Sequence, residues 1–162
     1  MKKGMFRELL FALSIVAVCV VIHTAGLVLF AEFLIHRFPK LERVATMKRQ
    51  VVALIFVFAV VMALHLIETS LWATFYYARG LFQDFETSLY FSLVTYGTMG
   101  FGDVVLPQRW RLLSGIEGIS GVLLCGLSGA FIFAVINALF QRRMQLRSSP
   151  VKTYSSSDTQ MD

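Results

Sequence analysis

Three long apolar runs constrain the fold of this chain more than any other feature of its sequence. They occupy residues 9–35, 51–78 and 112–140, and each exceeds the roughly 20 residues that an α-helix needs to cross a bilayer core. Of the 162 residues, 57% are hydrophobic and only 15% are charged, whereas about a quarter of a soluble domain is charged. The sequence therefore predicts an all-α membrane protein with three transmembrane helices.

Basic residues beside these runs predict how the chain is oriented. Segment 36–50 and the segment after the third run contain Arg37, Lys40, Arg43, Lys48, Arg49, Arg142, Arg143 and Arg147. The positive-inside rule places both segments in the cytoplasm, which leaves the N-terminus outside although it carries Lys2, Lys3 and Arg7. Because the basic residues flank apolar runs and form no face with interleaved aromatics, the net charge of +5 indicates no nucleic-acid partner.

A glycine-rich motif, Thr-Tyr-Gly-Thr-Met-Gly-Phe-Gly-Asp, lies between the second and third runs at residues 95–103. Backbone carbonyls can replace the hydration shell of a cation if the chain runs extended with its C=O groups turned inward. Gly100 and Gly102 permit this because glycine adopts backbone angles that other residues avoid, and the Thr98 hydroxyl adds one more oxygen. The expected ion-binding residues are Thr98, Met99, Gly100, Phe101 and Gly102. The alternative, a Gly-rich loop between two helices, is disfavoured by the membrane spans on both sides.

The motif resembles the potassium channel signature, Thr-x-x-Thr-Val-Gly-Tyr-Gly-Asp, and the likeness extends from about residue 84 to about residue 137. Met99 and Phe101 replace the usual Val and Tyr; both side chains are expected to face away from the ion, so the backbone oxygens remain. The resemblance implies passive conduction of K+ without enzymatic chemistry or a cofactor. It also implies four identical chains around one pore in the lipid of the inner or plasma membrane.

The apolar runs, the basic residues, the Ser- and Thr-rich end of the chain and the resemblance together divide the chain into segments. We expect an N-terminal transmembrane helix and basic cytoplasmic loop (1–50), a pore domain (51–141) and a basic, disordered cytoplasmic tail (142–162). Within the pore domain we expect an outer helix (51–78), a pore helix (84–96), a filter (98–103) and an inner, pore-lining helix (112–140). Asp84 and Glu86 open the pore helix, where carboxylates favour the positive end of a helix dipole. That leaves the negative end aimed at the membrane centre.

Further residues are expected to support the filter or to gate the pore. In many potassium channels a pore-helix Glu braces the Asp of the filter, but Val94 occupies the equivalent position here. Asp103 must find another partner, and Tyr90 is placed to offer its hydroxyl. Glu117 is expected to hydrogen-bond backbone of the filter or pore helix. By its match to the family, Gly121 stands at the gating hinge of the inner helix.

Polar residues inside membrane spans are costly and therefore functional candidates. His65 and Glu68 lie at i and i+3 on one helix face, where they can share a hydrogen bond. A metal site would need a third ligand, for which His23 of the first span is the obvious source. A hydrogen-bonded polar cluster joining the first and second spans is the favoured interpretation, and no metal site is expected.

Two other functions remain open at this level. A weakly selective cation channel would result if fewer carbonyl sites were intact, although the complete Gly-Phe-Gly argues against it. A non-conducting membrane accessory subunit would carry the same motif as a vestige.

Overall fold

The computed structural model describes residues 2–37 and 47–148, which are helical apart from the connections. The elements are α1 (Lys2–Arg37), α2 (Met47–Ala78), α3 (Phe85–Tyr96), the 3-10 helix η2 (Gln108–Trp110) and α4 (Arg111–Ser148). Helical segments Phe6–His36, Gln50–Ala78 and Gln108–Gln141 are long and apolar enough to span a membrane, and these residue ranges contain no strand. The prediction of an all-α membrane protein with three spans is confirmed.

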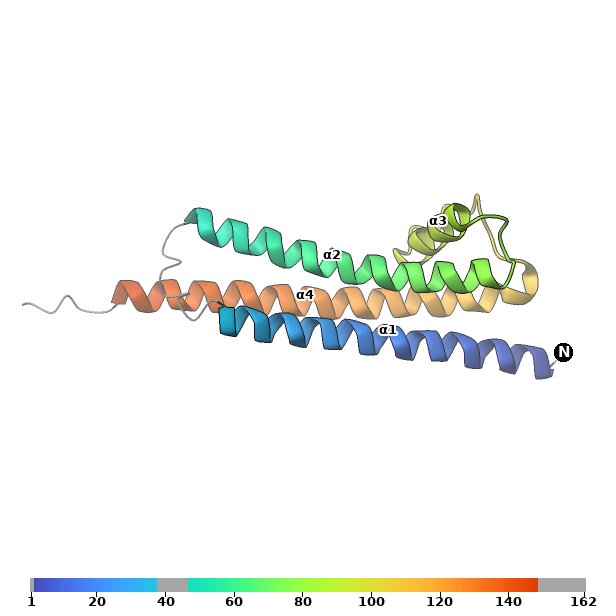
Figure 1. Cartoon of the computed structure of the whole chain (residues 1–162), viewed down its shortest axis with the longest axis horizontal. Helices are drawn as coiled ribbons and strands as arrows, with labels where there is room; N and C mark the ends of the chain where they lie inside the picture. Colours follow the sequence, from blue (N-terminus) through green and yellow to red (C-terminus); the bar gives the residue numbers. More distant parts are fainter. Residues whose placement is uncertain (1, 38–46, 149–162) are drawn as a thin grey trace, which may run out of the picture.

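The three long helices run side by side, and the short helix α3 packs against α2 and α4 at one end of the bundle (Figure 1). Helix α1 packs against both α4 and α2. The N-terminal end of α1 lies at the end of the bundle that carries α3, and the start of α2 lies at the opposite end (Figure 1). The N-terminus and the glycine-rich motif therefore share one end, which is the relative arrangement that the basic residues predict.

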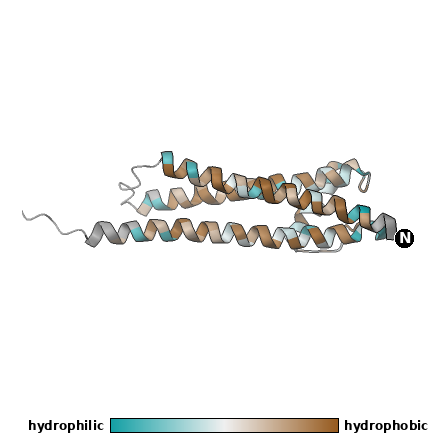
Figure 2. Ribbon diagram, turned by 90° about the horizontal axis from the view of Figure 1, so that it is seen from below, coloured by the Kyte–Doolittle hydropathy of each residue, from teal (hydrophilic) through white to brown (hydrophobic). Residues whose placement is uncertain are grey.

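Apolar residues predominate along the long helices (Figure 2), and many of them are exposed on the outside of the bundle. Exposed examples, each at least 64% accessible, are Val21, Leu29, Ile55 and Phe133. A helix that is apolar all round is stable only where its outer face meets lipid or other helices. The surface of this bundle is therefore that of a protein whose solvent is hydrocarbon.

The fourth helix is longer than expected. It continues past residue 140 to Ser148, because segment 141–147 contains neither Gly nor Pro and consists of good helix formers. The start of the expected disordered tail is therefore helix, and the rest of that tail, 149–162, lies outside the described residues. So does segment 38–46 of the basic loop.

The main core cluster lies at the α3 end of the bundle and holds α3 against the long helices. Its largest members are Trp72 and Tyr76 of α2, Phe91 and Tyr96 of α3, and Leu113 of α4. Helix α1 enters the same cluster through Ala12 and Cys19, which are fully buried. The N-terminal helix thus packs as an integral part of the fold that positions the glycine-rich motif.

Candidate ion-conduction site

The start of helix α3 is fixed by a side-chain cap. One carboxylate oxygen of Asp84 accepts the Thr87 backbone N–H at 2.7 Å, and the other accepts the Thr87 hydroxyl at 2.9 Å. These bonds lower the pKa of Asp84, chiefly through the backbone N–H, because they favour the ionised form. Since a carboxylate at this end also complements the helix dipole, Asp84 sets where α3 begins.

The end of α3 holds the first residues of the glycine-rich motif. The Leu93 carbonyl accepts the Gly97 N–H at 3.0 Å, and the Val94 carbonyl accepts the N–H groups of Met99 at 2.9 Å and Gly100 at 3.3 Å. The last turn of a helix leaves carbonyls without intrahelical partners, and here the motif supplies donors for them. The motif is therefore tied directly to α3.

The backbone of the motif alternates in handedness along residues 98–102. The φ angles of Thr98, Gly100 and Gly102 are 56°, 56° and 78°, whereas those of Met99 and Phe101 are not positive. Such alternation lets successive carbonyls point to one side of an extended strand, the requirement for a row of ion-binding oxygens. The sequence predicts positive φ angles at the two glycines. It does not predict one at Thr98, because a β-branched residue rarely adopts the left-handed conformation.

Small residues let α4 approach this segment closely. A Cβ at Gly121 would lie 2.2 Å from the Tyr96 carbonyl oxygen, and one at Gly118 would lie 3.3 Å from the Thr95 carbonyl oxygen. Gly121, expected as a gating hinge, sits within the continuous helix α4. Close packing of α4 against α3 therefore requires a residue without a side chain at this position. The role of Gly121 in gating stays a prediction.

Glu117 lies behind the pore helix and is completely buried. Its two carboxyl oxygens meet the Tyr76 hydroxyl of α2 at 2.7 Å and the Ser92 hydroxyl of α3 at 2.5 Å. The Ser92 hydroxyl also lies 2.9 Å from the Thr69 carbonyl oxygen. The expectation that Glu117 would bond to backbone is therefore corrected, since its partners are side-chain hydroxyls that link α2, α3 and α4.

Asp103 is the last residue of the motif and lies within hydrogen-bonding distance of α3. The Tyr90 hydroxyl donates to an Asp103 carboxylate oxygen at 2.7 Å, which is the partner expected in place of the residue at position 94. This hydrogen bond lowers the pKa of Asp103 and raises that of Tyr90. The contact joins the outer end of the motif to the middle of α3.

A second polar cluster lies midway along the long helices and connects α1, α2, α3 and α4. Its consecutive contacts are His23 Nδ1 to Glu68 Oε1 (2.8 Å), Glu68 Oε2 to Tyr96 Oη (2.5 Å), Tyr96 Oη to His65 Nδ1 (3.0 Å), His65 Nε2 to Ser128 Oγ (3.1 Å) and Ser128 Oγ to His23 Nε2 (3.0 Å). We call this closed circuit the polar ring. The expected cluster joining the first and second spans is present. Sequence reasoning missed Tyr96 and Ser128, since neither carries a charge or a distinctive spacing.

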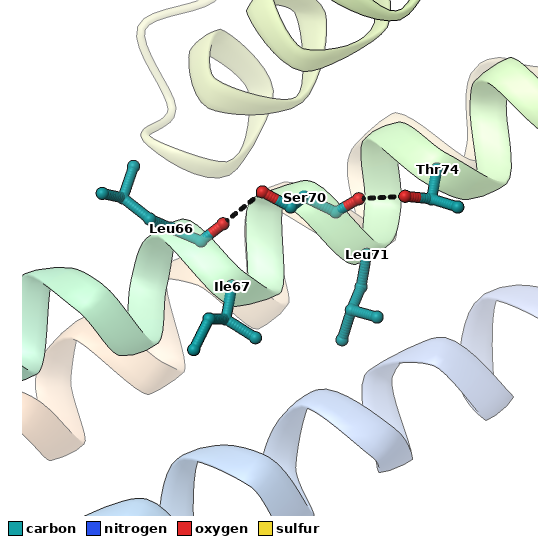
Figure 3. A pocket seen from close by; sticks show the side chains of 5 residues that line it. All are labelled: Leu66, Ile67, Ser70, Leu71 and Thr74. Atoms are coloured by element: carbon teal, nitrogen blue, oxygen red, sulfur yellow. Dashed lines mark hydrogen bonds between the residues drawn. The ribbon is translucent and has the colours of Figure 1, made fainter.

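A shallow groove on α2 carries no free polar group. It is lined by Leu66, Ile67, Ser70, Leu71 and Thr74 (Figure 3). The Ser70 hydroxyl donates to the Leu66 carbonyl and the Thr74 hydroxyl to the Ser70 carbonyl, within the same helix (Figure 3). The groove is therefore apolar in character, and the candidate site is confined to the motif and the clusters behind it.

The family of the chain follows from residues 51–139, which match the ion channel family. This match covers more than half of the chain and contains most of α2, all of α3 and most of α4, so the protein belongs to this family of membrane ion channels. A similar protein is TWiK family of potassium channels protein 18 from Caenorhabditis elegans, 38% identical over 69 residues. The matched part is 43% of this chain but only 13% of that relative. No solved structure matches significantly.

Proposed function

We propose that this protein is a potassium-selective channel that conducts K+ passively across the cell membrane through a homotetrameric pore. The observation that carries the proposal is the alternating handedness of residues 98–102 at the end of a capped pore helix. That backbone offers a row of oxygens to a dehydrated ion. Membership of an ion channel family and the similarity to a protein named as a potassium channel favour the same function.

The need for several chains follows from what one chain supplies. One copy of the motif provides a single row of carbonyls, whereas dehydration of K+ requires oxygens on all sides. Met99 and Phe101 are 56% and 67% exposed in the single chain, and irregular backbone at membrane depth is tolerated only when protein or pore water surrounds it. Four copies around an axis enclose both. Conduction of this kind needs no cofactor and no enzymatic step, and K+ is the only ligand required.

Flux measurements on the purified protein in liposomes test this function. We expect K+ and Rb+ to permeate while Na+ and Li+ are nearly excluded. Comparable Na+ and K+ flux would indicate a weakly selective cation channel, and absence of flux from folded tetramers would indicate an accessory membrane subunit. Mass measurement of the detergent-solubilised particle tests for four chains separately from conduction.

A pair of glycine variants tests whether the motif is the ion path. Gly100 and Gly80 both have positive φ (56° and 65°), and neither has a neighbour within 4 Å of an added Cβ. The backbone strain of an alanine is therefore similar at both, but Gly80 lies in the loop before α3. Gly100→Ala is expected to abolish selective K+ flux, while Gly80→Ala retains it. Wild-type selectivity in Gly100→Ala would show that the ion path lies elsewhere.

A further inference from the structure

The polar ring contains a buried carboxylate that no Lys or Arg contacts among the described residues. Glu68 and His23 are fully buried, and the side chain of His65 is 14% exposed. Burying a carboxylate inside a membrane span is costly unless a positive charge or several donors compensate it. The groups facing Glu68 are His23 from α1, His65 from its own helix and Tyr96 from α3.

The ring has one hydrogen fewer than it has contacts. With Glu68 ionised and both imidazoles neutral, the two histidines, Ser128 and Tyr96 bring one hydrogen each, which makes four. The circuit has five contacts of 2.5 to 3.1 Å, so one contact lacks a hydrogen. Either one additional proton or a bound cation is needed to complete the circuit.

The arrangement of ligand atoms favours a metal cation. His23, His65 and Glu68 each place one ligand atom within 4.8 Å of the other two, and the Nδ1 atoms lie 2.8 Å and 3.3 Å from the two Glu68 carboxylate oxygens. In a tetrahedral zinc site with bonds of about 2.0–2.2 Å, ligand atoms are separated by roughly 3.3 Å. The Nδ1–carboxylate separations are therefore close to those between ligand atoms of a tetrahedral site.

The remaining ring atoms supply a fourth ligand and an outer shell. The Tyr96 hydroxyl lies within 3.0 Å of both Glu68 and His65, next to the position that the ion would take. The Nε2 atoms of both histidines lie 3.0 and 3.1 Å from Ser128 Oγ. Metal-bound histidines characteristically donate their other N–H to such a neighbouring acceptor, which fixes the orientation of the ring.

We propose that His23, His65 and Glu68 form a structural site for a zinc-class dication, with Tyr96 at the fourth position and Ser128 orienting the imidazoles. Two imidazole nitrogens favour Zn2+ over Mg2+ or Ca2+, which prefer oxygen ligands. The ion ties α1 to α2 beside Tyr96, two residues before Thr98. The site is independent of the proposed K+ conduction, because none of its ligands belongs to residues 98–102.

Metal binding to the purified full-length protein in detergent tests the proposal. After removal of metal with a chelator, Zn2+ titration by calorimetry is expected to show one site per chain, and Co2+ to give the strong visible absorption of tetrahedral coordination. His23→Gln, His65→Gln and Glu68→Gln should each abolish binding. The matched control is His36→Gln, because His36 is the remaining histidine, stands exposed on α1 and contacts Glu32.

A variant outside the ligand set distinguishes a specific effect on metal binding from loss of folding. Ser128→Ala leaves all ligands in place and removes only the shared acceptor, so Zn2+ affinity should fall roughly 10–100-fold. Zn2+ should also raise the melting temperature of the wild type and of His36→Gln. Absence of Zn2+ binding by the folded wild type, or binding that His36→Gln removes and Ser128→Ala leaves unchanged, would overturn the proposal and leave the ring as a hydrogen-bonded cluster alone.

Discussion

At the scale of single residues, a glycine and a buried carboxyl group hold the helices behind the motif together. Gly121 lets α4 reach the Tyr96 carbonyl, and Glu117 gathers hydroxyls from α2 and α3. In lipid there is little hydrophobic drive between helices, so close contact and hydrogen bonds determine their association. Substitutions at these two positions therefore test the packing most directly.

Gly121→Ala is expected to disturb the contact between α4 and α3. The added Cβ would lie 2.2 Å from a backbone oxygen, which cannot swing aside as a flexible side chain could. Overpacking of this kind costs about 1–3 kcal/mol, so the thermal unfolding temperature and the K+ flux should both fall. Gly115→Ala is the control, because a Cβ there meets no atom of the chain within 4 Å. Equal behaviour of the two variants would contradict the proposed contact.

Replacements of Glu117 should separate hydrogen bonding from charge. Both partners are hydroxyls that donate to Glu117. In Glu117→Gln the amide oxygen still accepts from one hydroxyl, and the amide NH2 can donate to the Ser92 oxygen while Ser92 donates to the Thr69 carbonyl, so this variant is expected to be mild. Glu117→Ala leaves the Tyr76 and Ser92 hydroxyls without this partner, at a cost of about 1–3 kcal/mol for each buried group. Single-channel recording of Glu117→Ala should show shorter open times at nearly unchanged conductance. A severalfold loss of conductance in Glu117→Gln would instead place this residue on the ion path.

At the scale of elements, the motif is attached to α3 at two points. The N–H groups of Met99 and Gly100 donate to the Val94 carbonyl, and the Asp103 carboxylate accepts the Tyr90 hydroxyl. A loop held at two points along the same helix can keep its carbonyls aligned while an ion passes. The attachment through Asp103 depends on an ionised carboxylate. Acid should therefore weaken it only at a pH low enough to protonate Asp103.

External acidification should release the Asp103 attachment only well below neutral pH. Because the hydrogen bond from Tyr90 lowers the pKa of Asp103, its stabilising effect persists above the usual Asp value of about 3.9 and disappears as the pH falls through the lowered pKa. K+ flux attributable to this pair should therefore be constant between external pH of about 7.5 and about 5. Tyr90→Phe, which removes the donor, should move any acid inhibition to higher pH. Inhibition near pH 6 that Asp103→Asn abolishes would contradict this.

At the scale of the whole molecule, α1 adds a third span to the pore-forming helices and shares buried contacts with them. It meets α2 and α4 through the polar ring and supplies Ala12 and Cys19 to the main core cluster. Near the motif end, Glu8 forms an ion pair with Arg109, and the Arg79 guanidinium lies over the Phe11 ring at 4.4 Å. Removal of α1 would expose Glu68 and Ser128, the buried partners of His23, so α1 is an integral part of the packed fold.

The orientation of the bundle can be tested with single cysteines in a Cys19→Ser, Cys125→Ser background. Lys40→Cys is expected to react with a membrane-impermeant reagent only after the cells are opened, because the positive-inside rule places segment 36–50 in the cytoplasm. Gln83→Cys, exposed in the loop before α3 at the opposite end of the bundle, should react on intact cells and serves as the control. Labelling of position 40 from outside would reverse the topology.

The helical class, the three spans, the short helix α3 and the glycine-rich motif could all be predicted from the sequence. These are local properties, because bilayer thickness sets the length of an apolar run and the φ requirement of Gly100 and Gly102 belongs to each residue. Tertiary structure alone decided the partners of Glu117, the closure of the polar ring by Tyr96 and Ser128, and the contact of Gly121. Those depend on the rotation of each helix about its axis. A helix that is apolar on every side carries no stripe that indicates its inward face, so only packing reveals which polar groups meet.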